Sequence, residues 1–175
     1  MGKNYSFPDK MSKNMIYSNV TKLLKGLGRM GPELFTIGYE GATIDNFINS
    51  LQAHNINCIL DVRALPLSRK PGFSKTQLAG RLNHVKIRYI HLPELGTPKD
   101  IRDELKSTRD YVAFFKKMEN YLAGKKDAIR QAYNHVINTR CCLLCFERFA
   151  DQCHRKIVAE KIKSTNGDGL QIMHI

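Results

Sequence analysis

A short apolar run that leads into a polar loop and then an amphipathic helix constrains this chain most. Residues 141–145 are cysteine and leucine without interruption, the pattern of a strand buried on both faces. Polar side chains follow abruptly, and apolar residues at helical spacing then begin at Ile157. Strand, loop and helix in this order are the unit of an open α/β sheet, whose ligands bind beyond the carboxyl ends of the strands.

The rest of the chain repeats this unit. Other strands are predicted over residues 34–38, 57–62, 87–92 and 170–175. Helices are predicted after Thr43 and Ser74, which are good N-cap residues, and over 99–135, where Gly124 separates two helices. This alternation predicts a single α/β domain with a mostly parallel sheet of about five strands and helices on both faces.

The domain is expected to occupy residues 34–175, because a chain of 175 residues suits one good core. Residues 1–33 are rich in Lys, Ser, Asn and Gly, and we interpret them as a basic N-terminal appendage. A short amphipathic helix is predicted within it, near residues 15–24.

The formal net charge is +12, which favours nucleic acid or nucleotide partners through attraction and counterion release. The alternative is a solvated basic surface without a partner. No apolar run is long enough for a transmembrane helix or a signal-peptide core, so no membrane partner is expected. Five cysteines, three of them within five residues, do not resemble a secreted disulfide framework, which favours the cytoplasm. The oligomeric state is not indicated.

Polar side chains gather where the predicted strands end. Because the carboxyl ends of parallel strands share one edge of a sheet, these residues are expected to form one site. Tyr39 follows the first strand, Asp61 and Arg63 end the second, and His91 ends the third. Cys145 and Glu147 follow the fourth, and Cys153, His154 and Arg155 enter the next helix.

The loop over residues 63–73 carries two prolines, a glycine, three cations and the Ser68 hydroxyl. Such a loop suits contact with phosphate, because Arg donates paired hydrogen bonds and Lys supplies a point charge. An exposed basic loop without a ligand is the alternative.

Candidate catalytic groups are Asp61, Glu147, Cys153 and His154, with Glu147 the preferred general acid or base. Substrate contacts are expected from Tyr39, Arg63, Ser68, His91, Cys145 and Arg155. Arg63 and Arg155 are expected to hold an anion and to face one cavity together with Glu147. The alternative is that Asp61–Arg63 and Glu147–Arg155 are structural ion pairs.

The cysteines allow a second chemistry. Cys142, Cys145, Cys153 and His154 are considered as a zinc site, but residues three apart on a strand point to opposite faces, so no metal site is predicted. A reactive thiol at Cys153 is also considered, since it lies near a helix N-terminus. Cys58, Cys141 and Cys142 are interpreted as buried and inert. No particular cofactor is indicated.

A set of short motifs occurs in this order: Thr36-Ile37-Gly38-Tyr39; Asp61-Val62-Arg63 with Pro66 and Ser68; Tyr89-Ile90-His91-Leu92-Pro93-Glu94-Leu95-Gly96; and Leu144-Cys145 with Glu147 and Cys153-His154-Arg155. The ordered set resembles the domain-of-unknown-function family numbered four-eight-eight, over roughly residues 34–175. The resemblance implies a single α/β domain and implies no mechanism. The pair Cys141-Cys142 departs from the family's pattern.

These observations favour an enzyme-like domain that acts on a phosphate-bearing substrate, a nucleotide or nucleic acid, at the carboxyl edge of the sheet. One alternative is a non-catalytic nucleic-acid-binding module. Another is a metal- or thiol-based redox regulator.

Overall fold

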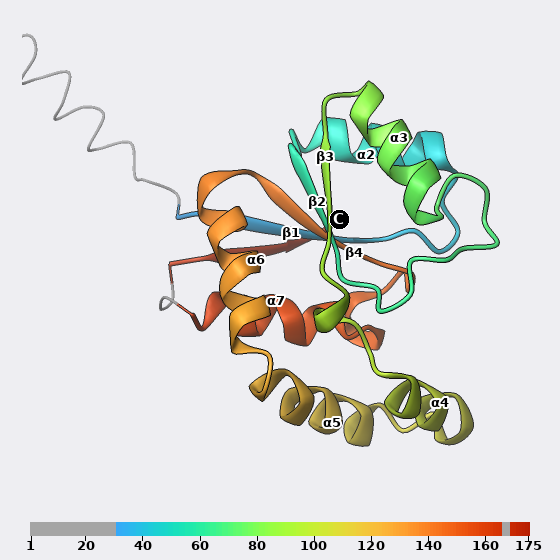
Figure 1. The fold of residues 1–175 in the computed structure, drawn as a ribbon, viewed down its shortest axis with the longest axis vertical. Coiled ribbons are helices and arrows are strands. Elements are labelled where there is room, and N and C mark those ends of the chain that lie inside the picture. The colour runs from blue at the N-terminus through green and yellow to red at the C-terminus, as the bar shows by residue number, and fades with distance from the viewer. Residues whose placement is uncertain (1–30, 166–168) are drawn as a thin grey trace, which may run out of the picture. The chain divides into compact units, whose positions relative to one another are not determined.

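Five parallel strands form the central sheet of the computed structural model, which describes residues 31–165 and 169–175 (Figure 1). The strands are β1 (Glu33–Gly38), β2 (Cys58–Asp61), β3 (Arg88–His91), β4 (Cys141–Cys145) and β5 (Gln171–His174). Their spatial order is β3-β2-β4-β1-β5, and every neighbouring pair is parallel. The predicted α/β class and strand number are confirmed.

The strand register brings the predicted polar positions to one edge. Gly38 pairs with Cys145 across β1 and β4, and Asp61 pairs with both Leu144 and His91. β4 lies in the middle of the sheet and is buried along its whole length. Its apolar sequence therefore reflects a strand with no face towards water, while the chain turns polar where it leaves the sheet.

Helices cover both faces of the sheet (Figure 1). On one face are α2 (Ile44–Ala53) and α3 (Lys75–His84), which pack Phe47 and Leu78 against it. On the other face are α4 (Lys99–Thr108), α5 (Tyr111–Ala123), α6 (Lys126–Asn138) and α7 (Arg155–Lys163). Short 3-10 helices span Pro93–Leu95 and Ala150–Gln152.

The helical stretch predicted over residues 99–135 consists of three helices. Gly124 separates α5 from α6 as expected, but the break after α4 was not predicted. That break lies at Arg109, whose backbone is left-handed with a φ of 57°, and Asp110 then caps α5 by accepting from the Ala113 amide. Since arginine gives no sequence signal for this conformation, the pattern alone could not find it.

The predicted appendage lies largely outside the described residues, and the predicted helix near residues 15–24 lies wholly outside them. β1 begins at Glu33, one residue before the predicted domain start. Among the described helices, none is both long and apolar enough to span a bilayer.

Candidate functional site

A cavity of about 280 Å³ opens at the carboxyl edge of the sheet. It is bounded by the loop after β2, by α4 and by the loop after β4. Its polar lining includes Arg63, Ser68, Arg69, Arg102, Glu147 and His154. Aromatic and aliphatic side chains complete the wall, among them Tyr39, Leu65 and Phe146. The cavity therefore combines cations, one carboxyl group and apolar surface.

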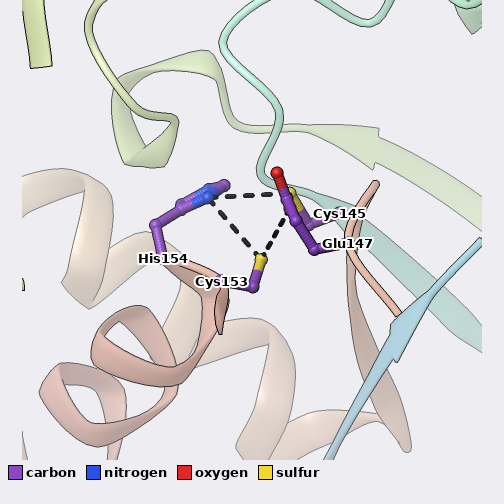
Figure 2. A group of neighbouring side chains, drawn as sticks. All are labelled: Cys145, Glu147, Cys153 and His154. Carbon is purple, nitrogen blue, oxygen red and sulfur yellow. Dashed lines mark hydrogen bonds between the residues drawn. The ribbon is translucent and has the colours of Figure 1, made fainter. Parts of the chain in front are cut away.

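Four side chains on the β4–α7 side of this cavity converge on one point; we call them the thiol cluster (Figure 2): Cys145, Glu147, Cys153 and His154. Their sulfur, oxygen and nitrogen atoms all lie within 4.8 Å of one another. Glu147 Oε2 accepts a hydrogen bond from each thiol, at 3.0 Å to each sulfur. Three of the four residues are buried, and Glu147 is half-buried.

The imidazole of His154 has a fixed orientation. Its Nε2 lies 2.9 Å from the carbonyl oxygen of Val62, which can only accept, so Nε2 carries the hydrogen. In the neutral ring Nδ1 then carries a free lone pair. The Nδ1 atom lies 3.6 Å from the sulfur of Cys145 and 3.8 Å from that of Cys153. The backbone of β2 thus holds this nitrogen towards the two sulfurs.

The loop that carries Glu147 is fixed by its backbone. The amides of Tyr39 and Glu40 donate to the carbonyls of Cys145 and Phe146, which extends the β1–β4 pairing past the strand ends. Gly38 makes this approach possible, because a Cβ there would lie 1.8 Å from the carbonyl oxygen of Glu147. The guanidinium of Arg155 also donates to that oxygen and to the carbonyl of Arg148.

Burial and mutual contact shift the pKa values of the thiol cluster. Burial raises the pKa of Glu147 above its usual value, and burial with the neighbouring groups raises the pKa of Cys145. Burial also opposes the charged forms of Cys153 and His154. For Cys153 the hydrogen bond with Cys145 and the contact with His154 outweigh burial, and for His154 the contact with Cys153 does so. The pKa of Cys153 is therefore lowered and that of His154 raised. The two cysteines are thus unequal, with Cys153 the more acidic.

Asp61 and Arg63 belong to a second buried group, here called the Asp61 network. Both Nε and Nη2 of Arg63 donate to the Asp61 carboxylate, and Nη1 donates to Tyr39 Oη and the Phe73 carbonyl at 3.0 and 2.9 Å. Tyr89 Oη also donates to Asp61. Although burial opposes it, the Asp61 carboxylate raises the pKa of Arg63. All charges of this network are matched internally.

The predicted site residues divide accordingly. Tyr39, Arg63, Ser68, Cys145, Glu147 and His154 line the cavity, and Cys153 lies directly behind it in the thiol cluster. Asp61 is enclosed in its network, and His91 Nε2 hydrogen-bonds to the carbonyl of Arg63. These two residues therefore hold the loop after β2 and do not line the cavity.

The expectation that Arg155 faces the cavity with Arg63 is wrong. Arg155 is 1% exposed, and its guanidinium donates to Thr36 Oγ1 and to two loop carbonyls, on the α7 face of the sheet. The guanidinium of Arg63 contacts Tyr39 and Phe73 on the opposite face. The proposed Glu147–Arg155 ion pair is also absent from the described residues, since the contact uses the backbone carbonyl.

The zinc set that includes Cys142 is likewise excluded by geometry. Cys142 packs with Leu144 in the core under α2 and α3, whereas Cys145 joins the thiol cluster across the sheet. The fourth member of the thiol cluster is Glu147 and not Cys142. Cys58, Cys141 and Cys142 are buried as expected.

Sequence reasoning missed Arg102, Phe146 and Gln152 as cavity residues. The sequence could have indicated Phe146, because this residue lies between the predicted site residues Cys145 and Glu147. Its side chain is 44% exposed. Arg102 lies on α4, and no motif distinguishes it from the other cations of that helix.

Residues 43–162 match the family model described as "Domain of unknown function DUF488". The match spans more than half of the chain, and the protein belongs to this family, as the ordered motifs predicted. No curated protein and no solved structure matches the chain significantly.

Proposed function

We propose that this domain is an enzyme that binds a phosphate-bearing substrate, a nucleotide or nucleic acid, in the cavity at the carboxyl edge of its sheet. The observation that carries the proposal is the pairing of unmatched cations with a carboxyl group in one cavity. Arg69 and Arg102 line it, and neither forms an ion pair within the described residues. Unmatched guanidiniums around a cavity favour an anionic ligand.

The remaining lining suits the rest of such a ligand. Leu65, Leu67 and Phe146 are exposed apolar side chains at the cavity. Aromatic and apolar surface beside cations is typical of sites that stack a base and hold its phosphate. The cationic loop with Ser68 supplies further donors, and the net charge of +12 adds long-range attraction. Together these features favour a nucleotide over inorganic phosphate.

Two features support Glu147 as the reacting group. It is the one carboxyl group among the cavity-lining residues. Hydrogen bonds between the loop after β1 and the loop after β4 fix its backbone. A fixed carboxyl group within reach of a bound ligand is the usual form of a general acid or base. We assign the anion contact to Arg69 and Arg102, and the proton transfer to Glu147.

Binding tests the first half of the proposal. Full-length protein is titrated with a nucleoside monophosphate and with a short mixed-sequence single strand, at low and moderate salt. Arg102→Ala is expected to weaken binding about tenfold or more, because a charge-assisted hydrogen bond is lost, and binding should fall as salt rises. Arg130→Ala is the control, because it removes the same charge from exposed α6, outside the cavity. Equal effects of the two substitutions would refute the site.

Turnover tests the second half. Bound nucleotides from a small panel are incubated with the protein, and products are followed by mass spectrometry. Glu147→Gln is expected to keep substrate binding within a few-fold and to abolish product formation. Full turnover by that variant contradicts the assigned role of Glu147.

A further inference from the structure

We propose that Cys145, Cys153 and His154 bind one thiophilic divalent metal ion of the zinc class, with Glu147 as an exchangeable fourth donor facing the cavity. The inference stands apart from the proposed substrate, since it concerns how four donor atoms are arranged. It assigns the two cysteines of the thiol cluster a ligand role in place of free thiols.

The first support for a metal site is the chemistry of the donor atoms. Two thiols, one imidazole and one carboxyl group meet within 4.8 Å (Figure 2). Sulfur and nitrogen donors in a four-fold set favour Zn²⁺ and its neighbours, whereas Ca²⁺ and Mg²⁺ require oxygen donors. The cluster therefore selects the class of metal through its chemistry.

The spacing agrees with one ion. Zn–S bonds of about 2.3 Å and Zn–N bonds of about 2.0 Å give a sulfur–nitrogen separation of about 3.6 Å around a tetrahedral ion. The two separations from His154 Nδ1 are 3.6 and 3.8 Å. The sulfur–oxygen separations of 3.0 Å are shorter, as expected where the thiol hydrogens bridge to Glu147. On binding, those two hydrogens leave as protons and the ion takes their position.

His154 supplies an independent observation. Metal-binding histidines characteristically donate their second ring N–H to a carbonyl or carboxylate, which fixes the tautomer and aims the lone pair. Nε2 of His154 makes this bond to the Val62 carbonyl, and the ring is only 5% exposed. A buried imidazole whose lone pair points at two buried sulfurs is prepared as a ligand.

Charge gives a third argument. Deprotonation of this cluster places several negative charges in a buried site, which is costly without a compensating cation. Among the described residues no Lys or Arg side chain forms an ion pair with Glu147. The guanidinium of nearby Arg155 donates its hydrogen bonds to two backbone carbonyls and to Thr36 Oγ1. Because His154 must be neutral to bind a metal through Nδ1, a divalent ion supplies the compensating charge.

Glu147 is the donor able to leave. It is half-buried and lines the cavity, while Cys153 is enclosed. With the ion bound, displacement of Glu147 would leave one coordination position for a ligand oxygen, as in catalytic zinc sites, and the ion would polarise that oxygen. The displaced carboxyl group would remain beside that ligand as the acid or base, a role that rests on the proposed function.

Titration of reduced, chelator-treated full-length protein with Co²⁺ alone tests the site. We expect one equivalent to bind with the thiolate-to-cobalt absorption and visible bands of a tetrahedral centre, which Zn²⁺ then displaces. Cys145→Ser and Cys153→Ser should each abolish the tetrahedral spectrum, and Glu147→Gln should weaken binding roughly tenfold. Cys142→Ala is the matched control, because that thiol is buried on the other face of the sheet.

Circular dichroism of each variant verifies that it is folded. Absence of a thiolate–cobalt band in the wild type, its survival in folded Cys145→Ser, or its loss in Cys142→Ala would overturn the assignment. Rapid formation of a Cys145–Cys153 disulfide in preference to metal uptake in air, detected by mass, would also overturn it in favour of thiol redox chemistry. Because no phosphate compound is present, failure here leaves the anion-binding result unaffected.

Discussion

Asp61 and Glu147 are carboxyl groups at the same edge of one sheet, yet their surroundings are opposite. Asp61 is fully buried and is met by the guanidinium of Arg63 and the hydroxyl of Tyr89. Glu147 is half-buried beside a cavity and is met by two thiols, and no Lys or Arg among the described residues pairs with it. The charge of Asp61 is matched within the protein, whereas Glu147 has no Lys or Arg partner in the part of the chain that the structure describes.

This difference separates structural from functional polarity. A buried ion pair with all hydrogen bonds satisfied is costly to break and contributes mainly to holding one arrangement of the chain. A buried cluster of titratable groups beside a cavity, with pKa values shifted by burial and mutual contact, is typical of functional sites. Both regions contain residues that we predicted to be catalytic, and only the second has the surroundings of a site.

The largest effect is expected from breaking the Asp61 network. Asp61→Ala leaves the guanidinium of Arg63 buried without its partner, which should cost about 3–5 kcal/mol of unfolding free energy. Glu147→Gln should change it by less than about 1 kcal/mol, since no ion pair is lost. Urea unfolding measures both. Equal losses would mean that Glu147 is a structural residue too.

Stabilisation by a bound metal should depend on the thiol cluster and not on the Asp61 network. Zn²⁺ at a hundredfold excess over its dissociation constant should stabilise the wild type by about 2.7 kcal/mol through mass action. Cys153→Ser should remove that gain, and any folded Asp61→Asn protein should keep it, because Asp61 contributes no donor to the thiol cluster. Thermal unfolding with and without metal checks the prediction. A gain that survives in Cys153→Ser places the metal elsewhere.

Two glycines sharpen the comparison, because each lets one of these regions pack closely. A Cβ at Gly38 would lie 1.8 Å from the Glu147 carbonyl oxygen, and one at Gly96 would lie 2.1 Å from the Ala64 amide nitrogen, beside the Asp61 network. Both glycine-to-alanine substitutions should cost about 1–3 kcal/mol through overpacking. Only Gly38→Ala should also weaken Co²⁺ binding, by about tenfold. Cobalt titration of both variants measures the difference.

Much of the fold could be predicted because strand and helix patterns in this sequence agree with the final environment. The run Cys141–Cys145 is apolar throughout, and it forms the central strand. Thr43 both looks like an N-cap and accepts the Asn46 amide. The break at Arg109 escaped prediction because a left-handed arginine is fixed by its neighbours and not by its own preference.

The location of the candidate site could be predicted from the sequence, but the roles of its residues could be predicted only in part. Parallel strands dictate that residues at their carboxyl ends share one edge, which brought Cys145, Glu147 and His154 to the cavity. Sequence does not reveal where a long guanidinium points. Arg155 turns to loop carbonyls, and Arg102 reaches the cavity from a helix without a motif. Such directions depend on packing across the sheet, which local pattern does not encode.

The smallest effect isolates one hydrogen bond of the Asp61 network. Tyr89→Phe removes the hydroxyl that donates to Asp61 and leaves the ion pair with Arg63 intact, so we expect a loss of about 1–2 kcal/mol near neutral pH. Metal binding should not change.

The pH dependence of this loss gives a second check. Burial, together with the hydrogen bond and charge of Asp61, raises the pKa of Tyr89 above its usual value, which the unfolded chain retains near 10. A raised folded pKa contributes stability that is complete below about pH 10 and is lost as pH rises further, because the unfolded chain releases the proton first. The stability difference between wild type and Tyr89→Phe, measured by urea unfolding from pH 7 to 11, should therefore be constant at first and shrink above about pH 10. A difference that grows there would mean that the hydroxyl is ionised more easily in the folded protein, and that Asp61 is not its partner.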